Sequence, residues 1–276
     1  MRKLLRAGFS RLLKDKVFIV SCIAMAVSGA LFAVLHYFDN LNNDAGWTPD
    51  STCFIYAFIV PILTALLCAL FVGCEYSDGT MRNKIISGHR RGAIYLSNLI
   101  ICSAAGIIMC LAYLAVHTCA GILLLGGFTM SGGKLIVNTA LTFALVVAFA
   151  GLFVLIAMLC SGKAYSTAAC LLLTFALLLV GIRITSALNE PEYFSGYSMT
   201  QDGVTIEEGE TKNPNYVGGT KRQIYEFLND LLPGGQVIKL AKAGADAPAK
   251  IALYDAAILL AATGCGLVIF RKKDLK

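Results

Sequence analysis

Six long blocks of apolar residues divide the chain, and each is long enough to cross a lipid bilayer as a helix. A transmembrane helix needs about 20 mostly apolar residues, because each residue rises ~1.5 Å and the hydrocarbon layer is ~30 Å thick. The third block is longer than this, so we expect its helix to extend beyond the hydrocarbon. The blocks occupy residues 17–38, 52–74, 94–126, 135–160, 164–184 and 251–270. The pattern predicts an all-α membrane protein with six transmembrane helices.

The N-terminal segment, residues 1–16, has the pattern of an amphipathic helix. At about 100° per residue, Leu5, Phe9, Leu12 and Leu13 fall on one face, and cationic side chains fall on the other. Such a helix lies in the headgroup layer with its apolar face toward the acyl chains. We therefore expect an interfacial helix that continues to residue 16. The alternative is a basic flank that only orients the first transmembrane helix.

The polar segment between the second and third blocks, residues 75–93, predicts a short helix between two glycines. Gly79 permits a tight turn, and the hydroxyl of Thr80 is suited to cap the helix that follows. The helix is expected over residues 81–87, and Gly88 ends it. The segment is either a docking element for a soluble partner or a basic connector without one.

A second polar segment, residues 185–250, precedes the last block and is longer than a connector needs to be. Two short runs of aromatic or β-branched residues, 193–197 and 204–206, predict a small hairpin. Two short helices are expected after it, the first opening near Thr220 and the second over residues 236–243. The first helix carries an apolar face that we expect to pack against the transmembrane helices or the membrane surface. This face consists of Ile224, Phe227, Leu228 and Leu231.

Composition supports the membrane assignment and excludes several kinds of site. The chain is 57% hydrophobic and 14% charged, whereas soluble domains have about 45–50% apolar and ~25% charged residues. The ten cysteines include no CxxC pair, and the three histidines are far apart. We expect no disulfide framework, no metal site and no catalytic residues in this chain.

Ionisable residues inside the blocks are scarce, which argues against a proton-coupled or ion-coupled carrier. Arg183 and Asp255 are the exceptions, and both lie near the end of a block. We expect both side chains to reach the membrane interface.

The distribution of basic residues predicts the orientation. Most of the 23 Lys and Arg residues lie in the N-terminal segment, in residues 75–93 and in the C-terminal tail, residues 271–276, whereas the loop 39–51 has none. Cytoplasmic loops carry the excess of Lys and Arg, so both termini are expected in the cytoplasm and residues 185–250 outside. Anionic lipid accounts for the basic excess, and nucleic acid is not needed as a partner.

The segment 75–93 resembles the cytoplasmic motif of the type-two ABC transporter permease family. Glu75, Tyr76, Gly79, Thr80, Arg82, Ile85 and Ile86 match that motif, while Arg90 stands where the family usually has serine. The resemblance covers the whole order of elements: residues 1–16, residues 17–184 with five transmembrane helices, the long external segment, and the last helix over 251–270. It implies a coupling helix that docks on a separate ATPase. The implied coupling residues are Glu75, Gly79, Thr80, Arg82, Ile85, Ile86, Arg90 and Arg91.

Glu75 is expected at the membrane boundary, where a buried acid is costly unless it is paired. Basic residues of the same loop or of the N-terminal helix are the expected partners. No phosphate-binding loop of the form GxxxxGK[ST] occurs in the sequence. This chain is therefore expected to be no enzyme and to bind no cofactor, with ATP and Mg²⁺ held by the partner ATPase.

The resemblance implies a permease subunit in a bacterial cell membrane that pairs with a second copy or a related permease. Export of an amphipathic substrate such as a peptide, an antibiotic or a lipid is the expected function. The alternative is a membrane-anchored sensor or immunity scaffold that binds a ligand through its external segment without transport.

Overall fold

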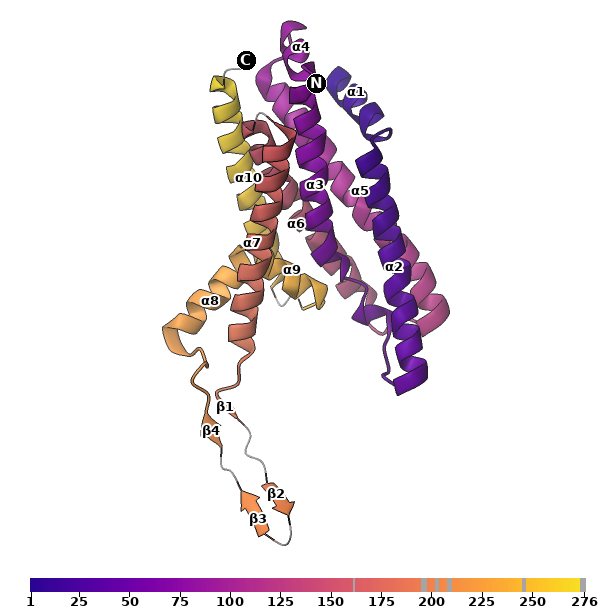
Figure 1. The fold of residues 1–276 in the computed structure, drawn as a ribbon, viewed down its shortest axis with the longest axis vertical. Coiled ribbons are helices and arrows are strands. Elements are labelled where there is room, and N and C mark those ends of the chain that lie inside the picture. Colours follow the sequence, from indigo (N-terminus) through magenta and orange to yellow (C-terminus); the bar gives the residue numbers. More distant parts are fainter. Residues whose placement is uncertain (161, 195–197, 202–203, 208–209, 245–246, 274–276) are drawn as a thin grey trace.

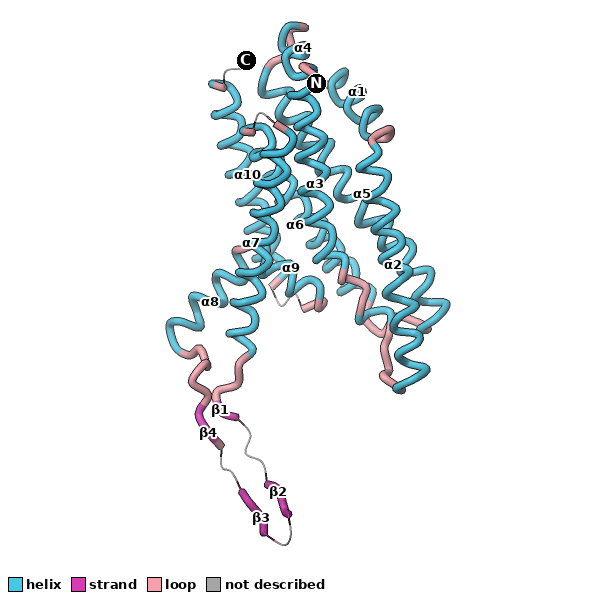
Figure 2. The backbone as a smooth tube through the Cα atoms, in the orientation of Figure 1, coloured by secondary structure: helices cyan, strands magenta, loops and turns pink. Residues whose placement is uncertain are grey.

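The computed structural model describes residues 1–276 except 161, 195–197, 202–203, 208–209, 245–246 and 274–276. Within the described residues, six helices are long and apolar enough to cross a membrane (Figure 1). They are α2 (Lys16–Asn43), α3 (Tyr56–Ser77), α5 (Arg91–Leu125), α6 (Gly132–Leu159), α7 (Lys163–Asn189) and α10 (Pro248–Lys272). Helices make up most of the chain, as Figure 2 shows. The predicted all-α membrane fold with six transmembrane helices is confirmed.

The six long helices form a bundle around α3 and α6. α3 packs against α5, α6 and α7, while α2 lies along α5 and α10 lies along α6. α2, α7 and α10 leave most of their apolar side chains exposed on the outside of the bundle. A contiguous apolar surface of this extent fits lipid and not water.

Figure 1 places α1 (Arg2–Leu12), α4 (Thr80–Ile86) and the last turn of α10 at one end of the bundle, which we call the basic end. The opposite end, the arm end, carries β1 (Tyr193–Phe194), β2 (Ser198–Gln201), β3 (Val204–Glu207) and β4 (Thr211–Lys212). β1 pairs antiparallel with β4, and β2 with β3. The strands therefore form a narrow arm that projects beyond the helices. Part of the predicted run 193–197 lies outside the described residues.

The N-terminal helix is shorter than its sequence pattern predicts. α1 ends at Leu12, because the carboxylate of Asp15 accepts hydrogen bonds from the amides of Val17 (2.8 Å) and Phe18 (3.2 Å) and so begins α2. Leu12 is buried against the bundle, whereas Leu13 lies beyond the helix and is 65% exposed. Leu5 and Phe9 are half-buried and pack against the core, as does Leu4, which the predicted face did not include.

Two helices connect the arm to the last transmembrane helix: α8 (Gly219–Leu231) and α9 (Pro233–Ala241). α9 begins three residues before the predicted start, because Pro233 at its first position has no N–H group that would need a partner. α9 is buried against α7, α3 and α6. It approaches α7 so closely that a Cβ atom on Gly181 would lie 2.3 Å from the backbone of Gly234.

The apolar face of α8 is not the face that the bundle covers. The residue of α8 that the bundle buries is Asn229, whose side-chain oxygen accepts a hydrogen bond from Thr185 of α7 at 3.1 Å. Ile224 is 52% exposed and Phe227 is 47% exposed, while Leu228 and Leu231 are half-buried. The Phe227 ring nevertheless meets the ring of Tyr254 on α10, with their centroids 6.1 Å apart.

Candidate coupling site

The short helix α4 is held between two glycines with left-handed backbone. Gly79 has φ +68° and Gly88 has φ +81°. A Cβ atom added to either glycine would meet nothing within 4 Å, so the requirement for glycine is conformational and not steric. The backbone thus fixes where α4 starts and how it turns back toward α5.

Thr80 does not cap α4, contrary to the prediction. Gly79 occupies the N-cap position, and Thr80 is the first helical residue. The Thr80 hydroxyl instead donates a hydrogen bond to the backbone oxygen of Glu75, at 3.1 Å. Thr80 therefore ties α4 back to the last turns of α3.

Glu75 is the centre of the site, and its side chain is 1% exposed. Its Oε1 atom accepts a hydrogen bond from Arg11 of α1 at 2.8 Å and another from Lys84 of α4. Its Oε2 atom accepts a third hydrogen bond from Asn98 of α5, at 3.0 Å. The expected pairing with basic residues of the loop and of the N-terminal helix is confirmed. One carboxylate thus joins α3 to α1, α4 and α5, which we call the Glu75 hub.

Arg11 reinforces the hub through contacts with α3. Its guanidinium lies 3.6 Å above the centre of the Phe71 ring and donates a second hydrogen bond to the Phe71 backbone oxygen at 2.8 Å. The planar guanidinium suits this combination of stacking and two-sided donation. α1 is therefore fastened to α3 at the basic end.

The two isoleucines of α4, expected to act together, face different ways. Ile85 is half-buried and packs against the core beside Met81, which is 1% exposed. Ile86 is 83% exposed. Neighbouring side chains on a helix point about 100° apart, so only one of the two isoleucines can face the bundle. Ile85 anchors α4, and Ile86 remains on the free surface with Arg82 and Arg90.

Arg91 also differs from its expected place on the docking surface. Its guanidinium donates hydrogen bonds to the backbone oxygens of Phe270 (3.2 Å), Arg271 (3.3 Å) and Lys273 at the end of α10. Basic side chains stabilise the unpaired carbonyls at a helix C-terminus. Arg91 therefore joins the start of α5 to the end of α10.

Lys273 makes a similar contact that the sequence reasoning missed. Its ammonium donates hydrogen bonds to the backbone oxygens of Met158 and Leu159 at the end of α6, both at 3.0 Å, and lies 4.5 Å from the centre of the Tyr76 ring. The Tyr76 hydroxyl donates to the same Met158 oxygen at 2.7 Å. Burial lowers the pKa of Lys273. A basic residue just after the last apolar block was the available signal, but the helix end that it caps depends on the tertiary fold.

A groove of about 410 Å³ lies between α1 and α4 on the surface of the basic end. Its lining includes the cationic or polar side chains of Lys3, Asn83, Lys84 and His89. The groove adjoins the Glu75 hub through Lys84, so a partner bound there would touch α1 and α4, two of the elements that the hub connects.

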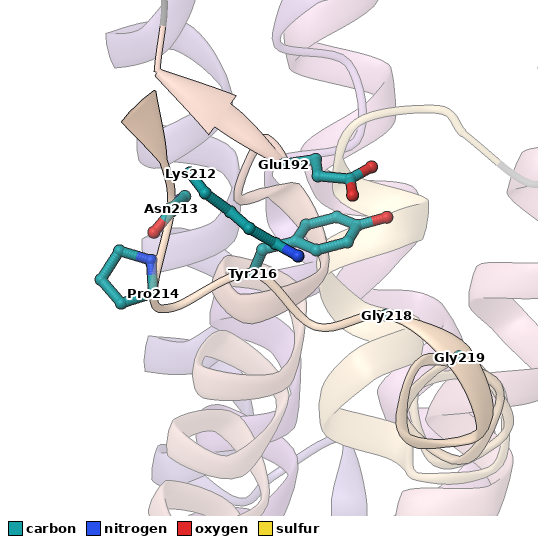
Figure 3. A pocket seen from close by; sticks show the side chains of 7 residues that line it. All are labelled: Glu192, Lys212, Asn213, Pro214, Tyr216, Gly218 and Gly219. Carbon is teal, nitrogen blue, oxygen red and sulfur yellow. The ribbon is translucent and has the colours of Figure 1, made fainter. Parts of the chain in front are cut away.

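The base of the arm holds another cavity, of about 640 Å³ (Figure 3). Figure 3 shows the side chains of Lys212 and Tyr216 close together, with Glu192 nearby. Asn213, next to Lys212, is 2% exposed, and its amide donates to Glu190 at 2.9 Å and to the Pro191 oxygen at 3.0 Å. These bonds are internal to the arm and hold its base in shape.

The fold and the site together define a multi-pass membrane protein with a rigidly mounted surface helix between its second and third transmembrane helices. A family model described as "ABC-2 family transporter protein" matches residues 4–181, which is more than half of the chain. The chain therefore belongs to the ABC-2 transporter family. The match begins in α1, includes α4 and the Glu75 hub, and ends in α7. No curated protein matches the chain.

Proposed function

We propose that this chain is the permease subunit of an ATP-driven exporter and that a separate ATPase docks on α4 and the groove beside α1. Membership of the ABC-2 transporter family supports a permease. The observation that carries the proposal is the Glu75 hub, because it connects the free surface of α4 to α1, α3 and α5. A partner that moves α4 moves the ends of two transmembrane helices with it.

The basic end faces the cytoplasm in this proposal, as the excess of Lys and Arg favours. The permease forms a two-fold dimer with a second copy or with a related permease. ATP and Mg²⁺ bind to the ATPase pair, whose closure pushes on α4 and switches the path between inward-facing and outward-facing states. An amphipathic cargo suits the apolar interior of the bundle, and a bacterial cell membrane is the proposed location.

Ile86 gives the most direct test. Ile86→Asp places a charge on the centre of the proposed docking surface without entering the core, since the side chain is 83% exposed. We expect the amount of ATPase that co-purifies with the permease to fall roughly tenfold or more, as for the loss of a central interface residue. Insertion and thermal stability are expected to stay unchanged.

Leu123→Asp is the matched control. Leu123 is 84% exposed near the end of α5, at the opposite end of the molecule. This variant is expected to retain the ATPase. Equal retention by Ile86→Asp would contradict docking on α4. If the wild-type chain recruits no ATPase at all, a sensor or scaffold explains the structure better than a permease does. The cavity at the base of the arm is then the candidate ligand-binding site.

A further inference from the structure

Asp255 lies within the last transmembrane helix and does not reach the interface, contrary to expectation. It is 2% exposed, and neither of its carboxylate oxygens has a hydrogen-bond partner among the described residues. Gln236 of α9 lies beside it, but the amide nitrogen of Gln236 donates to the backbone oxygen of Asp230 at 2.8 Å. The Gln236 side-chain oxygen is itself buried and without a donor. The second N–H group of the same amide is the nearest donor to Asp255, but it does not reach the carboxylate with hydrogen-bond geometry. The carboxylate is therefore buried without a full hydrogen-bond partner.

The lysines of this region do not supply the missing charge, and Lys134, which lines a cavity farther along α6, forms no hydrogen bond with Asp255. Lys239 and Lys250 both pair with Asp230, the latter at 2.7 Å. A buried charge is expected to be paired or to bind a cation, because an isolated carboxylate is costly to remove from water. The arrangement therefore requires either a proton on Asp255 or a cation that arrives from outside the chain.

The carboxylate borders a cavity that opens along the seam between α6 and α10. This cavity has a volume of about 270 Å³, and apart from Asp255 its lining is apolar, for example Phe143 and Ala256. A second cavity of about 430 Å³ lies farther toward the arm end on the same seam, bordered by Asn138 and Pro248. Five residues of α6 separate Asn138 from Phe143, which is about 7.5 Å along a helix. The two cavities therefore follow one another along the same seam, and we call the apolar cavity beside Asp255 the α6–α10 groove.

We propose that Asp255 binds the ammonium or guanidinium group of an amphipathic molecule whose apolar part lies in the α6–α10 groove. A protonated amine supplies donors to the two carboxylate oxygens, and a charge-assisted hydrogen bond is stronger than a neutral one. The smaller cavity has room for a cationic head and the first part of a chain. The cation belongs either to the exported cargo or to the headgroup of a membrane lipid. The cargo case rests on the proposed transport function.

The test uses the full chain in nanodiscs of phosphatidylcholine, whose quaternary ammonium donates no hydrogen bond. Dodecylamine and dodecanol are titrated against two readouts: the thermal unfolding midpoint, and the modification of Asp255 by dicyclohexylcarbodiimide, measured by peptide mass spectrometry. We expect dodecylamine to protect Asp255 at a concentration roughly tenfold or more below that of dodecanol. Equal protection by the two probes would overturn the proposal, because the groove would then recognise only the alkyl chain.

Variants separate a bound cation from a bound proton. Asp255→Asn is expected to weaken dodecylamine stabilisation roughly tenfold or more, while the same change at the exposed Asp44 leaves it at the wild-type value. Dodecylamine stabilisation that survives in Asp255→Asn would show that the residue acts as a neutral acid and would overturn the proposal. If Asp255→Asn does not fold, Ala256→Phe replaces it in the test, because it fills the groove from an exposed position and leaves the carboxylate in place. This variant is expected to lose the stabilisation by dodecylamine, and retained stabilisation would overturn the proposal.

Replacing part of the phosphatidylcholine by phosphatidylethanolamine identifies the source of the cation. Protection of Asp255 by this lipid alone assigns the site to a headgroup, and protection by dodecylamine alone assigns it to cargo. None of these measurements involves an ATPase, so their failure leaves the Ile86 test intact. Loss of ATPase docking likewise leaves the binding site intact.

Discussion

The two ends of the molecule each bury an acidic side chain, and they treat it in opposite ways. At the basic end, Glu75 is 1% exposed and accepts hydrogen bonds from Arg11, Lys84 and Asn98. Toward the arm end, Asp255 is 2% exposed and has no donor among the described residues. The residue class and the burial are the same, and only the partners differ.

This difference separates a structural role from a binding role. The partners of Glu75 come from three helices, so the carboxylate holds the basic end together and transmits displacement between its parts. Asp255 forms no ion pair among the described residues, and the amide of Gln236 beside it offsets little of the cost of burial. An acid that is buried and left unpaired beside a cavity is better explained by a ligand than by stability.

The largest expected effect comes from neutralising the hub. Glu75→Gln keeps the shape of the side chain but removes the charge that pairs with Arg11 and Lys84. Removing one partner of a fully buried pair costs about 3–5 kcal/mol. Because Arg11 is 36% and Lys84 is 23% exposed, both regain some hydration, and we expect a loss of about 2 kcal/mol, still short of that range. Thermal unfolding in nanodiscs measures it.

The control for the hub is Asp78→Asn at the same end. Asp78 is 61% exposed and lies 3.8 Å from Lys163. Pairs of this kind contribute little, so we expect a change within about 0.5 kcal/mol. If both variants lose the same stability, the Glu75 hub is not a special feature of the basic end.

A smaller effect is expected from Gly79, which sets the turn into α4. Gly79→Val forces a β-branched residue to φ +68°, at a cost of about 1–2 kcal/mol. Because no neighbour would clash with the new Cβ atom, the strain is expected to shift the backbone and tilt α4, which moves Lys84 away from Glu75. Stimulation of the ATPase by the permease should fall more than stability does. Gly79→Asn is the control, since asparagine tolerates left-handed backbone, and it should retain most of the stimulation.

At Asp255 we expect the substitution to raise the stability of the protein, whereas Glu75→Gln lowers it. Asp255→Asn replaces an unpaired carboxylate by a neutral amide of the same shape, so the protein without ligand should gain about 1 kcal/mol. The midpoint of thermal unfolding measures this beside Glu75→Gln under one condition. A loss as large as that of Glu75→Gln would show that Asp255 has an internal partner and would remove the contrast between the two ends.

Local sequence patterns were sufficient for the six transmembrane helices, because a run of about 20 apolar residues determines a span by itself. The predicted helix boundaries were wrong where a single capping residue, and not the apolar pattern of the segment, determines where a helix begins or ends. Asp15 ends the first helix early by starting the second, and Pro233 starts α9 early. Both residues were visible in the sequence, but neither changes the apolar period.

The charge pattern of the sequence was sufficient to predict that Glu75 pairs with basic residues. A buried acid next to a basic loop requires a basic partner, and Glu75 has two. The separate places of Ile85 and Ile86, and of Arg90 and Arg91, were not predictable, because neighbouring residues differ only in which side of the helix meets the bundle. The burial of Asp255 was not predictable because α6, the helix that packs along α10, is remote in sequence.

The smallest expected effect concerns Asp230, a paired acid at the arm end. Its side chain is 14% exposed and contacts Lys239, and Lys250 lies 2.7 Å away. Burial raises its pKa, but the hydrogen bonds and charges of the two lysines outweigh burial and bring the pKa below the usual value. Asp230 joins α8 to α9 and α10. The role of a buried acid therefore depends on whether it is paired, and not on the end of the molecule at which it lies.

The lowered pKa fixes the direction of the pH dependence. A group whose pKa is lower in the folded state stabilises the protein above its unfolded pKa, which is about 3.9 for Asp, and this contribution is lost as pH falls through the folded value. Wild-type protein and Asp230→Asn should therefore differ in unfolding midpoint at neutral pH and converge below about pH 4. Other acids titrate in the same window but are common to both proteins, so the difference isolates Asp230. A difference that stays constant with pH would mean that the lysines hold α8 by packing and not through the carboxylate.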